Sequence, residues 1–523
     1  MTGDGAMNGA QALIRTLVGA GVDTCFMNPG TSEMHFVAAL DAVPEMHSVL
    51  GLFEGVATGA AEGYARMAGK PAAVLLHLGP GLGNGLAHLH NARRGNVPVV
   101  NIVGDHATYH AKYDAPLQSD IESIARAVSP WIRTSTDAAK VAQDAADAVA
   151  AAQSPPGKVA TLILPADVCW TEAPGPVEPV AAEPPRGVSQ STVDQVAKVL
   201  TSGEPAALLL GGSSLFERAL VDASRVTTTT GAKLLAQTFP VRLERGAGLP
   251  AVERLGYLAE FAQVQLDGLR HLVLVDAPSP VSFFAYPGKA SDLVPEGCEV
   301  HVLAEAGDDA PAALAALADA VGAPADAVQL QEAFRPDRPT GALNAETFAA
   351  AIGAVLPDDA VVVDEGNTGG LFVSGATAGA PRHDWLCLPG GAIGFGMPVA
   401  TGAAIAAPGR RVVNLEADGS AMMSLQALWT QAREGLDVTT VILNNRSYAI
   451  LNLELARVGA EPGPRALEML DLTRPDLDFV SLAKGMGVPA TRATTAEELT
   501  EQLERAVAEP GPNLIEAVLP PTL

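Results

Sequence analysis

The chain has 523 residues, 48% of them hydrophobic and 18% charged, which is enough for about three globular domains. Nucleic acid and anionic membrane surfaces would both repel its formal net charge of −26, so we expect neither as a partner. The four cysteines are widely separated, residues 1–5 lack a leader-like pattern and no long apolar run occurs, which favours a cytoplasmic protein without a membrane span.

Two proline-rich stretches divide the chain. Residues 174–187 and 334–341 contain too many prolines for a helix or a central strand. They separate three segments of ordinary domain size, which we take as 1–173, 188–330 and 341–523. Because β-rich runs alternate with amphipathic helices, most clearly in the outer two, we expect an α/β fold with three doubly wound parallel-sheet domains.

The first functional candidates follow two short strands near the N-terminus. Asn-Pro-Gly-Thr-Ser-Glu at 28–33 comes after the strand expected at 24–27. Its hydroxyls, including that of Thr31, could bind a substrate carboxylate or cap the next helix, and the residues alone leave both open. His77 ends another buried-looking strand, where a lone histidine is either a core residue or a catalytic one.

A helix rich in small residues is expected over 55–66, and Glu54 stands near its start. The helix dipole favours a carboxylate in a first turn. Composition alone therefore assigns Glu54 an ordinary structural role.

The central segment carries a weaker signal. A strand at 206–210 leads into the turn Gly211-Gly212, and a strand at 271–275 ends at Asp276. A nucleotide such as FAD could bind at such a turn, but a lone Gly-Gly pair is a low-specificity feature. We favour a scaffold domain that binds nothing, so FAD has no support beyond this turn.

The C-terminal segment holds the most informative pattern. Ala-Asp-Gly-Ser at 417–420 follows a β-rich run at 411–415 and precedes a helical pattern at 423–434, and a second run at 438–443 ends at two asparagines. The carboxyl ends of neighbouring parallel strands meet at one edge of a sheet. Carboxylate and amide oxygens there suit Mg²⁺, and a helix N-terminus attracts phosphate. This pattern predicts a site for a diphosphate held by a cation.

The pattern resembles the thiamin diphosphate (ThDP) motif of the superfamily that includes acetolactate synthase, pyruvate oxidase and benzoylformate decarboxylase, with Ala417 where glycine is usual. The resemblance implies that Asp418, the Asn445 side chain and the Ser447 carbonyl bind Mg²⁺. It places five further residues near the diphosphate, namely Asn367, Thr368, Gly419, Ser420 and Asn444.

Other stretches carry the same resemblance. Family members have a glutamate before a helix ending in Gly-Tyr-Ala-Arg, which implies that Glu54 hydrogen-bonds the coenzyme's pyrimidine ring and activates it. The glycine-rich stretch at 388–398, which alone could be a flexible loop, is similar to a loop that supports the bent coenzyme. Ile393 would wedge between its two rings and the Gly391 carbonyl would accept a hydrogen bond from the pyrimidine amino group. His77 aligns with a catalytic histidine of the benzoylformate decarboxylase branch, and Thr31 lies at the rim of the active site.

The resemblance implies a small-molecule 2-oxo acid substrate that undergoes decarboxylation, carboligation or both, as in acetolactate synthase. A benzoylformate decarboxylase-like simple decarboxylase, a flavin-assisted oxidase or 2-hydroxyacyl thioester lyase, and an inactive regulatory homologue are the alternatives. Pro116 stands where acetolactate synthases have phenylalanine, and residues 282–287 offer no second histidine of the benzoylformate decarboxylase kind. Neither relative is matched throughout.

The resemblance also concerns assembly. In this superfamily the first domain binds the pyrimidine, the last binds the diphosphate, and the two meet across a subunit interface. We therefore expect a homodimer or homotetramer with active sites at that interface.

Overall fold

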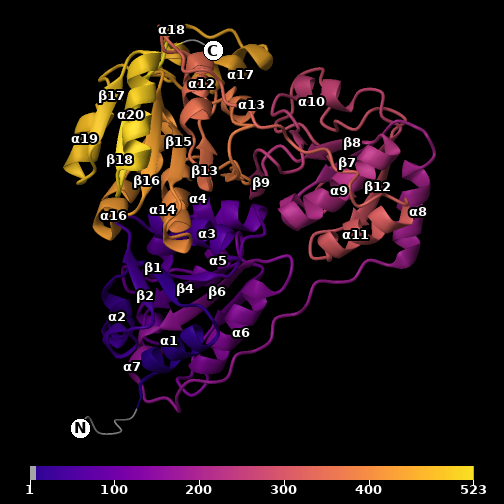
Figure 1. Cartoon of the computed structure of the whole chain (residues 1–523). Coiled ribbons are helices and arrows are strands. Elements are labelled where there is room, and N and C mark those ends of the chain that lie inside the picture. Colours follow the sequence, from indigo (N-terminus) through magenta and orange to yellow (C-terminus); the bar gives the residue numbers. More distant parts are fainter. Residues whose placement is uncertain (1–6, 522–523) are drawn as a thin grey trace.

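The computed structural model describes residues 7–521, which form three parallel-sheet domains (Figure 1). The α/β fold expected from the sequence is confirmed. Among residues 7–521, no helix combines the length and the apolar character needed to cross a bilayer. Residues 1–5, which entered the expectation about a leader, lie outside the described part.

The N-terminal domain, at the bottom of Figure 1, is built on a six-stranded parallel sheet in the order β2-β1-β3-β4-β6-β5. Alternate residues of its strands enter two different cores. Ala73 and Leu75 pack with helices on one face, while Val74 and Leu76 pack with those on the other, so this sheet is covered on both sides. The elements are α1 (Gly9–Gly19), β1 (Thr24–Asn28), α2 (Met34–Ala39), β2 (His47–Leu50), α3 (Glu54–Ala68), β3 (Ala72–Leu76), α4 (Leu78–Arg94), β4 (Val99–Asp105), α5 (Ile121–Ala125), β5 (Trp131–Thr134), α6 (Val141–Gln153), β6 (Val159–Pro165) and α7 (Ala166–Trp170).

The central domain, on the right in Figure 1, has a five-stranded parallel sheet in the order β10-β8-β7-β11-β12. Here too the two faces of a strand enter separate cores, since Leu208 and Leu210 pack apart from Leu209. The segment contains α8 (Gln190–Leu200), β7 (Ala206–Leu210), α9 (Glu217–Thr230), β8 (Lys233–Ala236), β9 (Leu243–Arg245), β10 (Glu253–Arg254), α10 (Ala259–Leu266), β11 (His271–Val275), β12 (Glu299–Ala304) and α11 (Ala310–Ala320).

The C-terminal domain, at the top of Figure 1, has a seven-stranded sheet in the order β17-β18-β16-β15-β13-β14-β9. Its elements are α12 (Ala345–Val355), β13 (Ala360–Glu365), α13 (Val373–Ala376), β14 (His383–Leu386), α14 (Gly396–Ala406), β15 (Val412–Ala417), α15 (Asp418–Ser424), α16 (Ala427–Glu434), β16 (Val438–Asn444), α17 (Ala449–Arg457), α18 (Pro464–Glu468), α19 (Phe479–Gly485), β17 (Ala490–Ala493), α20 (Ala496–Ala508) and β18 (Asn513–Val518). The single helical pattern expected at 423–434 is divided between α15 and α16.

One strand of this sheet comes from the central segment. β9 pairs antiparallel with β14, and Leu243 lies opposite Trp385. The neighbouring Arg242 donates from Nε to Asp384 Oδ1 at 2.6 Å, and the Arg245 guanidinium lies 5.0 Å from the Trp385 ring centroid. The central segment is therefore joined to the last sheet through a strand as well as through the chain.

Helices α3 and α14 hold the first and last domains together (Figure 1). Both are rich in small residues where they cross. A Cβ on Gly63 would overlap the Val399 carbonyl, and one on Gly402 would overlap the Ala60 carbonyl. These glycines allow the two backbones to approach closely. The helix that begins at Glu54 is thus fixed against the C-terminal domain of its own chain.

Candidate active site

Two neighbouring strands bring the main motifs to one edge of the C-terminal sheet. β15 and β16 are parallel, and Ala417 pairs with Leu443. The residues that follow these strands, Asp418 and Asn445, therefore leave the sheet side by side. The N–H of Arg446 donates to Asp418 Oδ2 at 2.6 Å, so the two motifs are in direct contact.

Asp418 is a buried carboxylate that no cationic side chain neutralises. Its side chain accepts hydrogen bonds from the backbone N–H groups of Gly419 and Arg446, and burial raises its pKa to about 6 in spite of them. Within residues 7–521, Asp418 forms no ion pair. A buried carboxylate of this kind gains from a bound cation, so Asp418 fits the metal ligand expected from the resemblance.

The other two expected metal ligands form a tight turn beside Asp418. The N–H of Ser447 donates to Asn445 Oδ1 at 3.0 Å. Arg446, between them, has a φ of 59°, in the left-handed region that a residue with a side chain rarely adopts. The turn is stabilised from the other side because the Tyr448 N–H donates to the Leu470 carbonyl at 2.9 Å. The amide and carbonyl oxygens of this turn are hard donors that suit Mg²⁺.

Asn444 is placed differently from its neighbour. Its Nδ2 donates to Glu516 Oε1 at 2.8 Å, on the adjacent strand β18, and its Oδ1 accepts from the Arg446 N–H at 3.2 Å. The side chain therefore lies within the sheet edge. In this structure Asn444 supports the Asn445–Ser447 turn.

The remaining diphosphate candidates lie around the start of α15. Asn367 follows β13, has a φ of 45° and donates from Nδ2 to Ser420 Oγ at 3.2 Å. Thr368 is half-buried next to it. A Cβ on Gly419 would overlap the Tyr448 ring, so only glycine fits there. Residues from the ends of β13, β15 and β16 thus surround one place.

Glu365 was not singled out from the sequence, although it belongs to the same edge. Its carboxylate accepts the N–H of Gly394 at 2.7 Å and that of Gly396 at 2.6 Å, and burial raises its pKa to about 7. Glu365 therefore fixes the end of the glycine-rich loop that carries Ile393. The sequence feature that could have indicated Glu365 is its position, because two acidic residues end a strand that begins with four apolar ones.

A second buried acid lies against Glu365. Glu416 pairs with it in register on the next strand, and burial, followed by the charge of Glu365, raises the pKa of Glu416. Asn414 donates from Nδ2 to Glu416 Oε2 at 3.0 Å. Two carboxyl groups this close and this buried cannot both carry a charge without great cost, so the pair favours a shared proton.

The glycine-rich loop is also held by the N-terminal domain. Asn91 on α4 donates from Nδ2 to the Ala392 carbonyl at 2.9 Å and accepts the Ala392 N–H at 3.1 Å. Gly391 has a φ of 76°, which favours glycine, and Ile393 is exposed. An apolar side chain that points to solvent from a fixed loop suits contact with a bound molecule.

Glu54 begins α3, as expected. Its Oε2 accepts a hydrogen bond from Asn84 Nδ2 on α4 at 3.0 Å, and its side chain is half-buried. Within residues 7–521, no hydrogen bond links Glu54 to the residues around Asp418.

His77 forms a pair with Glu33 that the sequence did not reveal. The buried Glu33 carboxylate lies 2.8 Å from His77 Nδ1, and Ser32 Oγ lies 3.3 Å from the same nitrogen. Gly30 is required here because a Cβ would overlap the His77 ring. The next residue, Leu78, has a φ of 51°, an unusual conformation for leucine. These contacts fix the orientation of the His77 ring.

Glu54 and His77 are neighbours across α4. A Cβ on Gly81 would lie 3.3 Å from Glu54 Oε1 and 3.5 Å from His77 Cβ. Thr31 is exposed, and within residues 7–521 its side chain forms no hydrogen bond. The structure thus brings together Glu54, His77 and Glu33 in the first domain, with Ser32 rather than Thr31 in contact with the histidine.

The Gly-Gly turn of the central domain is filled by a side chain. A Cβ on Gly212 would overlap the Asp276 carboxylate, which accepts the Ser213 N–H at 3.0 Å. Burial raises the pKa of Asp276 to about 6. The Ser213 N–H, which a phosphate would need as a donor, is already bonded to the Asp276 carboxylate, so the turn does not favour a nucleotide.

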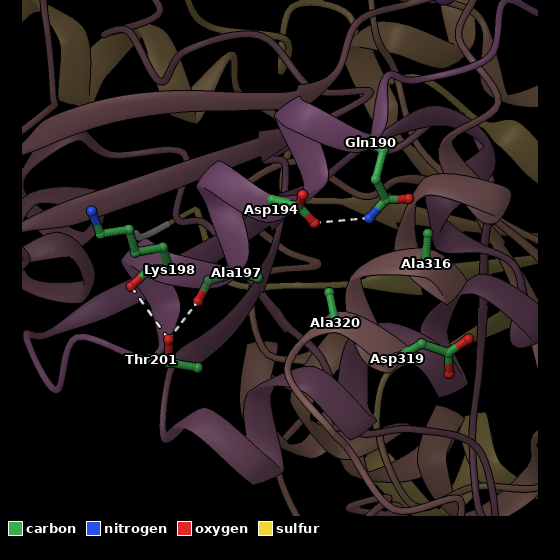
Figure 2. A pocket seen from close by; sticks show the side chains of 8 residues that line it. All are labelled: Gln190, Asp194, Ala197, Lys198, Thr201, Ala316, Asp319 and Ala320. Atoms are coloured by element: carbon green, nitrogen blue, oxygen red, sulfur yellow. Dashed lines mark hydrogen bonds between the residues drawn. The ribbon is translucent and has the colours of Figure 1, made fainter.

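A surface groove of ≈ 590 Å³ lies elsewhere on the central domain, between α8 and α11 (Figure 2). None of the residues predicted for the site contributes to it. Its lining consists of Gln190, Asp194, Ala197, Lys198, Thr201, Ala316, Asp319 and Ala320.

Comparison with known families identifies the class of protein. The family model described as "Thiamine pyrophosphate enzyme, N-terminal TPP binding domain" matches residues 7–126, and its C-terminal counterpart matches residues 375–517. The chain belongs to the thiamine pyrophosphate enzyme family and is a ThDP-dependent enzyme.

Individual relatives narrow the resemblance. The chain is 62% identical over 516 residues to IlvX of Mycobacterium tuberculosis, described as an acetolactate synthase large subunit-like protein, with 98% of this chain and 99% of the relative covered. It is 31% identical to benzoylformate decarboxylase of Pseudomonas aeruginosa, with 95% and 96% covered. Among solved structures, the ThDP-dependent 4-hydroxybenzoylformate decarboxylase of Rhodococcus jostii RHA1 superposes with a TM-score of 0.86 at 25% identity, covering 98% of this chain and 99% of that one.

Proposed function

We propose that the protein binds ThDP with Mg²⁺ and decarboxylates a small 2-oxo acid. The observation that carries this proposal is the contact between Asp418 and the Arg446 N–H, which joins a buried carboxylate to the Asn445–Ser447 turn. Asp418, Asn445 and Ser447 would hold the cation, and Asn367, Thr368 and Ser420 would lie near the diphosphate. The bound coenzyme supplies the carbon nucleophile and accepts the electron pair released with CO₂.

The side chains of the first domain would handle protons. Glu54 is held by Asn84 in an orientation that leaves Oε1 directed toward Gly81, away from the Asn84 bond. We infer that Glu54 exchanges a proton with the pyrimidine ring. His77, oriented by Glu33, would deliver or remove a proton at the substrate.

Two outcomes follow decarboxylation. In a simple decarboxylase the remaining carbon is protonated and an aldehyde leaves, and the His77–Glu33 pair supports this outcome because it provides a fixed proton donor. In a carboligase the same carbon adds to a second carbonyl, and the 62% identity to an acetolactate synthase large subunit-like protein supports that outcome. Oxidation or thioester cleavage has no such support here.

A substrate screen tests the proposal. The protein with ThDP and Mg²⁺ is given an aliphatic 2-oxo acid or benzoylformate, and CO₂ release and products are followed with and without an aldehyde acceptor. An aldehyde product indicates a decarboxylase, and a hydroxyketone indicates a carboligase. Coenzyme binding is checked separately, because the unmodified protein should bind ThDP more tightly than the Asp418→Asn variant. If it does, and no 2-oxo acid releases CO₂, the proposed decarboxylation is wrong.

We further propose that the active site forms between two copies of the chain, in a homodimer or homotetramer. The proposal of a shared site is supported by the hydrogen bonds of Glu54 and His77. Within residues 7–521, neither side chain is hydrogen-bonded to the residues around Asp418. Mixing inactive Glu54→Gln and Asp418→Asn proteins, followed by subunit exchange, tests this arrangement. A shared site in the hybrid contains Glu54 of one chain and Asp418 of the other, both unmodified, so activity should return. If each chain held a whole site, the mixture would stay inactive.

A further inference from the structure

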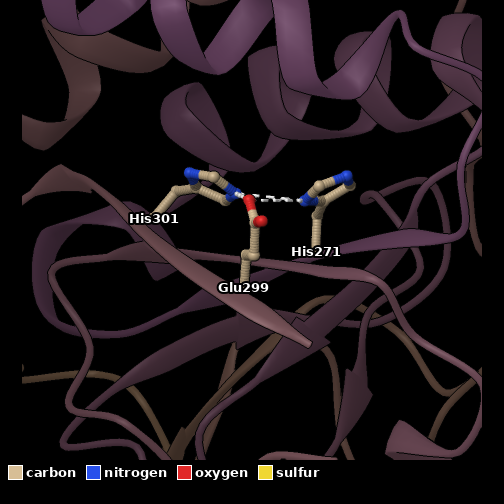
Figure 3. Close-up of side chains that lie close together, drawn as sticks. All are labelled: His271, Glu299 and His301. Atoms are coloured by element: carbon tan, nitrogen blue, oxygen red, sulfur yellow. Dashed lines mark hydrogen bonds and ion pairs between the residues drawn. The ribbon is translucent and has the colours of Figure 1, made fainter. Parts of the chain in front are cut away.

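Three side chains of the central domain converge at an edge far from any residue assigned above. β11 and β12 are neighbouring parallel strands, with His271 opposite Glu299 and Val273 opposite His301. His271 and Glu299 begin their strands, so the group lies at the amino ends of the sheet, whereas Asp276 and the Gly-Gly turn lie at the carboxyl ends. Figure 3 shows the two imidazole rings and the carboxylate directed toward one place.

The separations of the ligand atoms are near those of a metal site. His271 Nδ1 lies 3.1 Å from His301 Nε2, while Glu299 Oε2 lies 3.9 Å from the first nitrogen and 3.8 Å from the second. Ligand atoms around a tetrahedral ion with bonds of 2.0–2.2 Å are about 3.3 to 3.6 Å apart. Small rotations of the long Glu299 side chain would bring its oxygen into this range, and the two imidazole rings need to move apart only slightly.

A fourth residue orients the first histidine. Glu204, in the turn between α8 and β7, places Oε2 3.0 Å from His271 Nε2. A histidine that binds metal usually donates its other ring N–H to a carboxylate, which fixes the tautomer and leaves the remaining nitrogen with a free lone pair. Here that nitrogen is Nδ1, which faces His301. The ring of His271 is also largely buried, so its position is set by the fold.

We propose that His271, Glu299 and His301 form a binding site for a divalent transition metal of the Zn²⁺ class. Two imidazole nitrogens and one carboxylate oxygen are typical ligands of Zn²⁺, Co²⁺ or Ni²⁺, whereas Mg²⁺ prefers oxygen donors such as those around Asp418. The Glu299 side chain is 73% exposed, so an ion can enter from solvent and water can complete its coordination. A bound ion would tie β11 to β12 and stabilise the central domain.

Spectroscopy on the whole protein tests the site. The full chain is saturated with ThDP and Mg²⁺ so that the coenzyme site is filled, and Co²⁺ is added while the visible d–d absorption is recorded. We expect one equivalent per chain to give the absorption of a four- or five-coordinate ion with nitrogen ligands. Zn²⁺ should then displace Co²⁺ and remove the absorption, and the melting temperature should rise with Zn²⁺.

Two variants and a control make the result specific. His301→Gln and Glu299→Gln should each weaken Co²⁺ binding by at least about 10-fold. Glu299 lies at the surface, so this variant should remain folded even if His301→Gln does not. His47→Gln alters an exposed histidine outside the site, whose Nε2 lies 3.6 Å from the Glu434 carboxylate, and should leave binding unchanged. If Co²⁺ gives no absorption, or if Glu299→Gln titrates like the unmodified protein, the proposal is wrong.

Discussion

The carboxylate of Asp418 accepts a hydrogen bond from the backbone N–H of Arg446 across 2.6 Å, and this contact joins the two halves of the metal motif. It also holds Arg446 in its left-handed conformation, with a φ of 59°. The turn that offers the Asn445 and Ser447 oxygens is therefore preformed before a cation binds. Metal affinity should depend on the charge of Asp418 more than on its shape.

Asp418→Asn tests that expectation. Asparagine is nearly isosteric and keeps one oxygen acceptor, so the fold should survive, but the site loses its negative charge. We expect Mg²⁺-dependent ThDP binding to weaken by at least about 10-fold in calorimetric titration. The melting temperature without cofactor should change little, because removal of a buried charge offsets the loss of one of the two oxygens that accept the Gly419 and Arg446 N–H groups. Asp359→Asn, at an exposed acid paired with Arg410, is the matched control and should bind ThDP normally.

Glu54→Gln should separate chemistry from binding. The glutamine keeps the size of the side chain but cannot exchange the proton, so we expect kcat to fall by about 100- to 10,000-fold with ThDP affinity nearly unchanged. Asn84→Ala removes the hydrogen bond to Glu54 Oε2 and should cause a smaller loss. Steady-state kinetics and cofactor titration measure both. A Glu54→Gln protein with full activity would refute the assigned role.

The pair of His77 and Glu33 leads to a prediction about the substrate. His77→Gln removes the proton donor and should lower kcat by about 100-fold or more while ThDP binding persists. Glu33→Gln keeps the histidine but removes the carboxylate that fixes the orientation of its ring, so kcat should fall by a smaller factor while ThDP binding persists. Thr31→Ala is the control, because Thr31 is exposed and, within residues 7–521, its side chain forms no hydrogen bond to His77 or Glu33. An unchanged kcat in Glu33→Gln would rule out a role for Glu33 in orienting a catalytic histidine.

The sequence was sufficient for the strands and for the residues at their ends. Strands rich in β-branched residues, such as Val438–Asn444, are visible locally, and the meeting of their carboxyl ends at one edge follows from general rules for α/β sheets. Those rules are enough to predict that Asp418 lies beside Asn445. The family resemblance then assigned roles that composition did not, as for Glu54.

Contacts between distant segments were not visible in the same way. The contact between Glu33 and His77 exists only because β1 and β3 are adjacent in the sheet. Likewise Asn444 turns toward Glu516, which is 72 residues away. β9 joins a sheet outside its own segment through pairing with β14. Such partners are chosen by tertiary packing, which short-range patterns do not encode.

The buried Glu365 predicts an unusual pH dependence of stability. Burial raises its pKa in the folded protein from an ordinary value of 4.5 to about 7. Its contribution to stability is therefore fully present below pH 4.5 and is lost as the pH rises through about 7, because the unfolded chain releases the proton first. Glu365→Gln removes this titration and is neutral at every pH, so the unmodified protein should lose unfolding free energy relative to the variant as the pH rises from 4.5 toward 7. Urea denaturation of the cofactor-free protein at several pH values measures this, with the exposed Glu346→Gln as the control for one lost charge. A constant difference would exclude the raised pKa.

The crossing of α3 and α14 gives a prediction about domain packing. A Cβ on Gly402 would overlap the carbonyl oxygen of Ala60, and neither backbone can move without disturbing the helix that starts at Glu54. Gly402→Ala should therefore lower the unfolding free energy by about 1–3 kcal/mol through overpacking. Gly375→Ala, in the short helix α13, is the matched control because a Cβ there meets nothing within 4 Å. It should be neutral or slightly stabilising, since alanine reduces the entropy of the unfolded chain. If Gly402→Ala also reduces kcat while Gly375→Ala does not, the α3–α14 contact positions Glu54 as well as holding the domains together. Unchanged stability in Gly402→Ala would mean that the two helices are not packed as described.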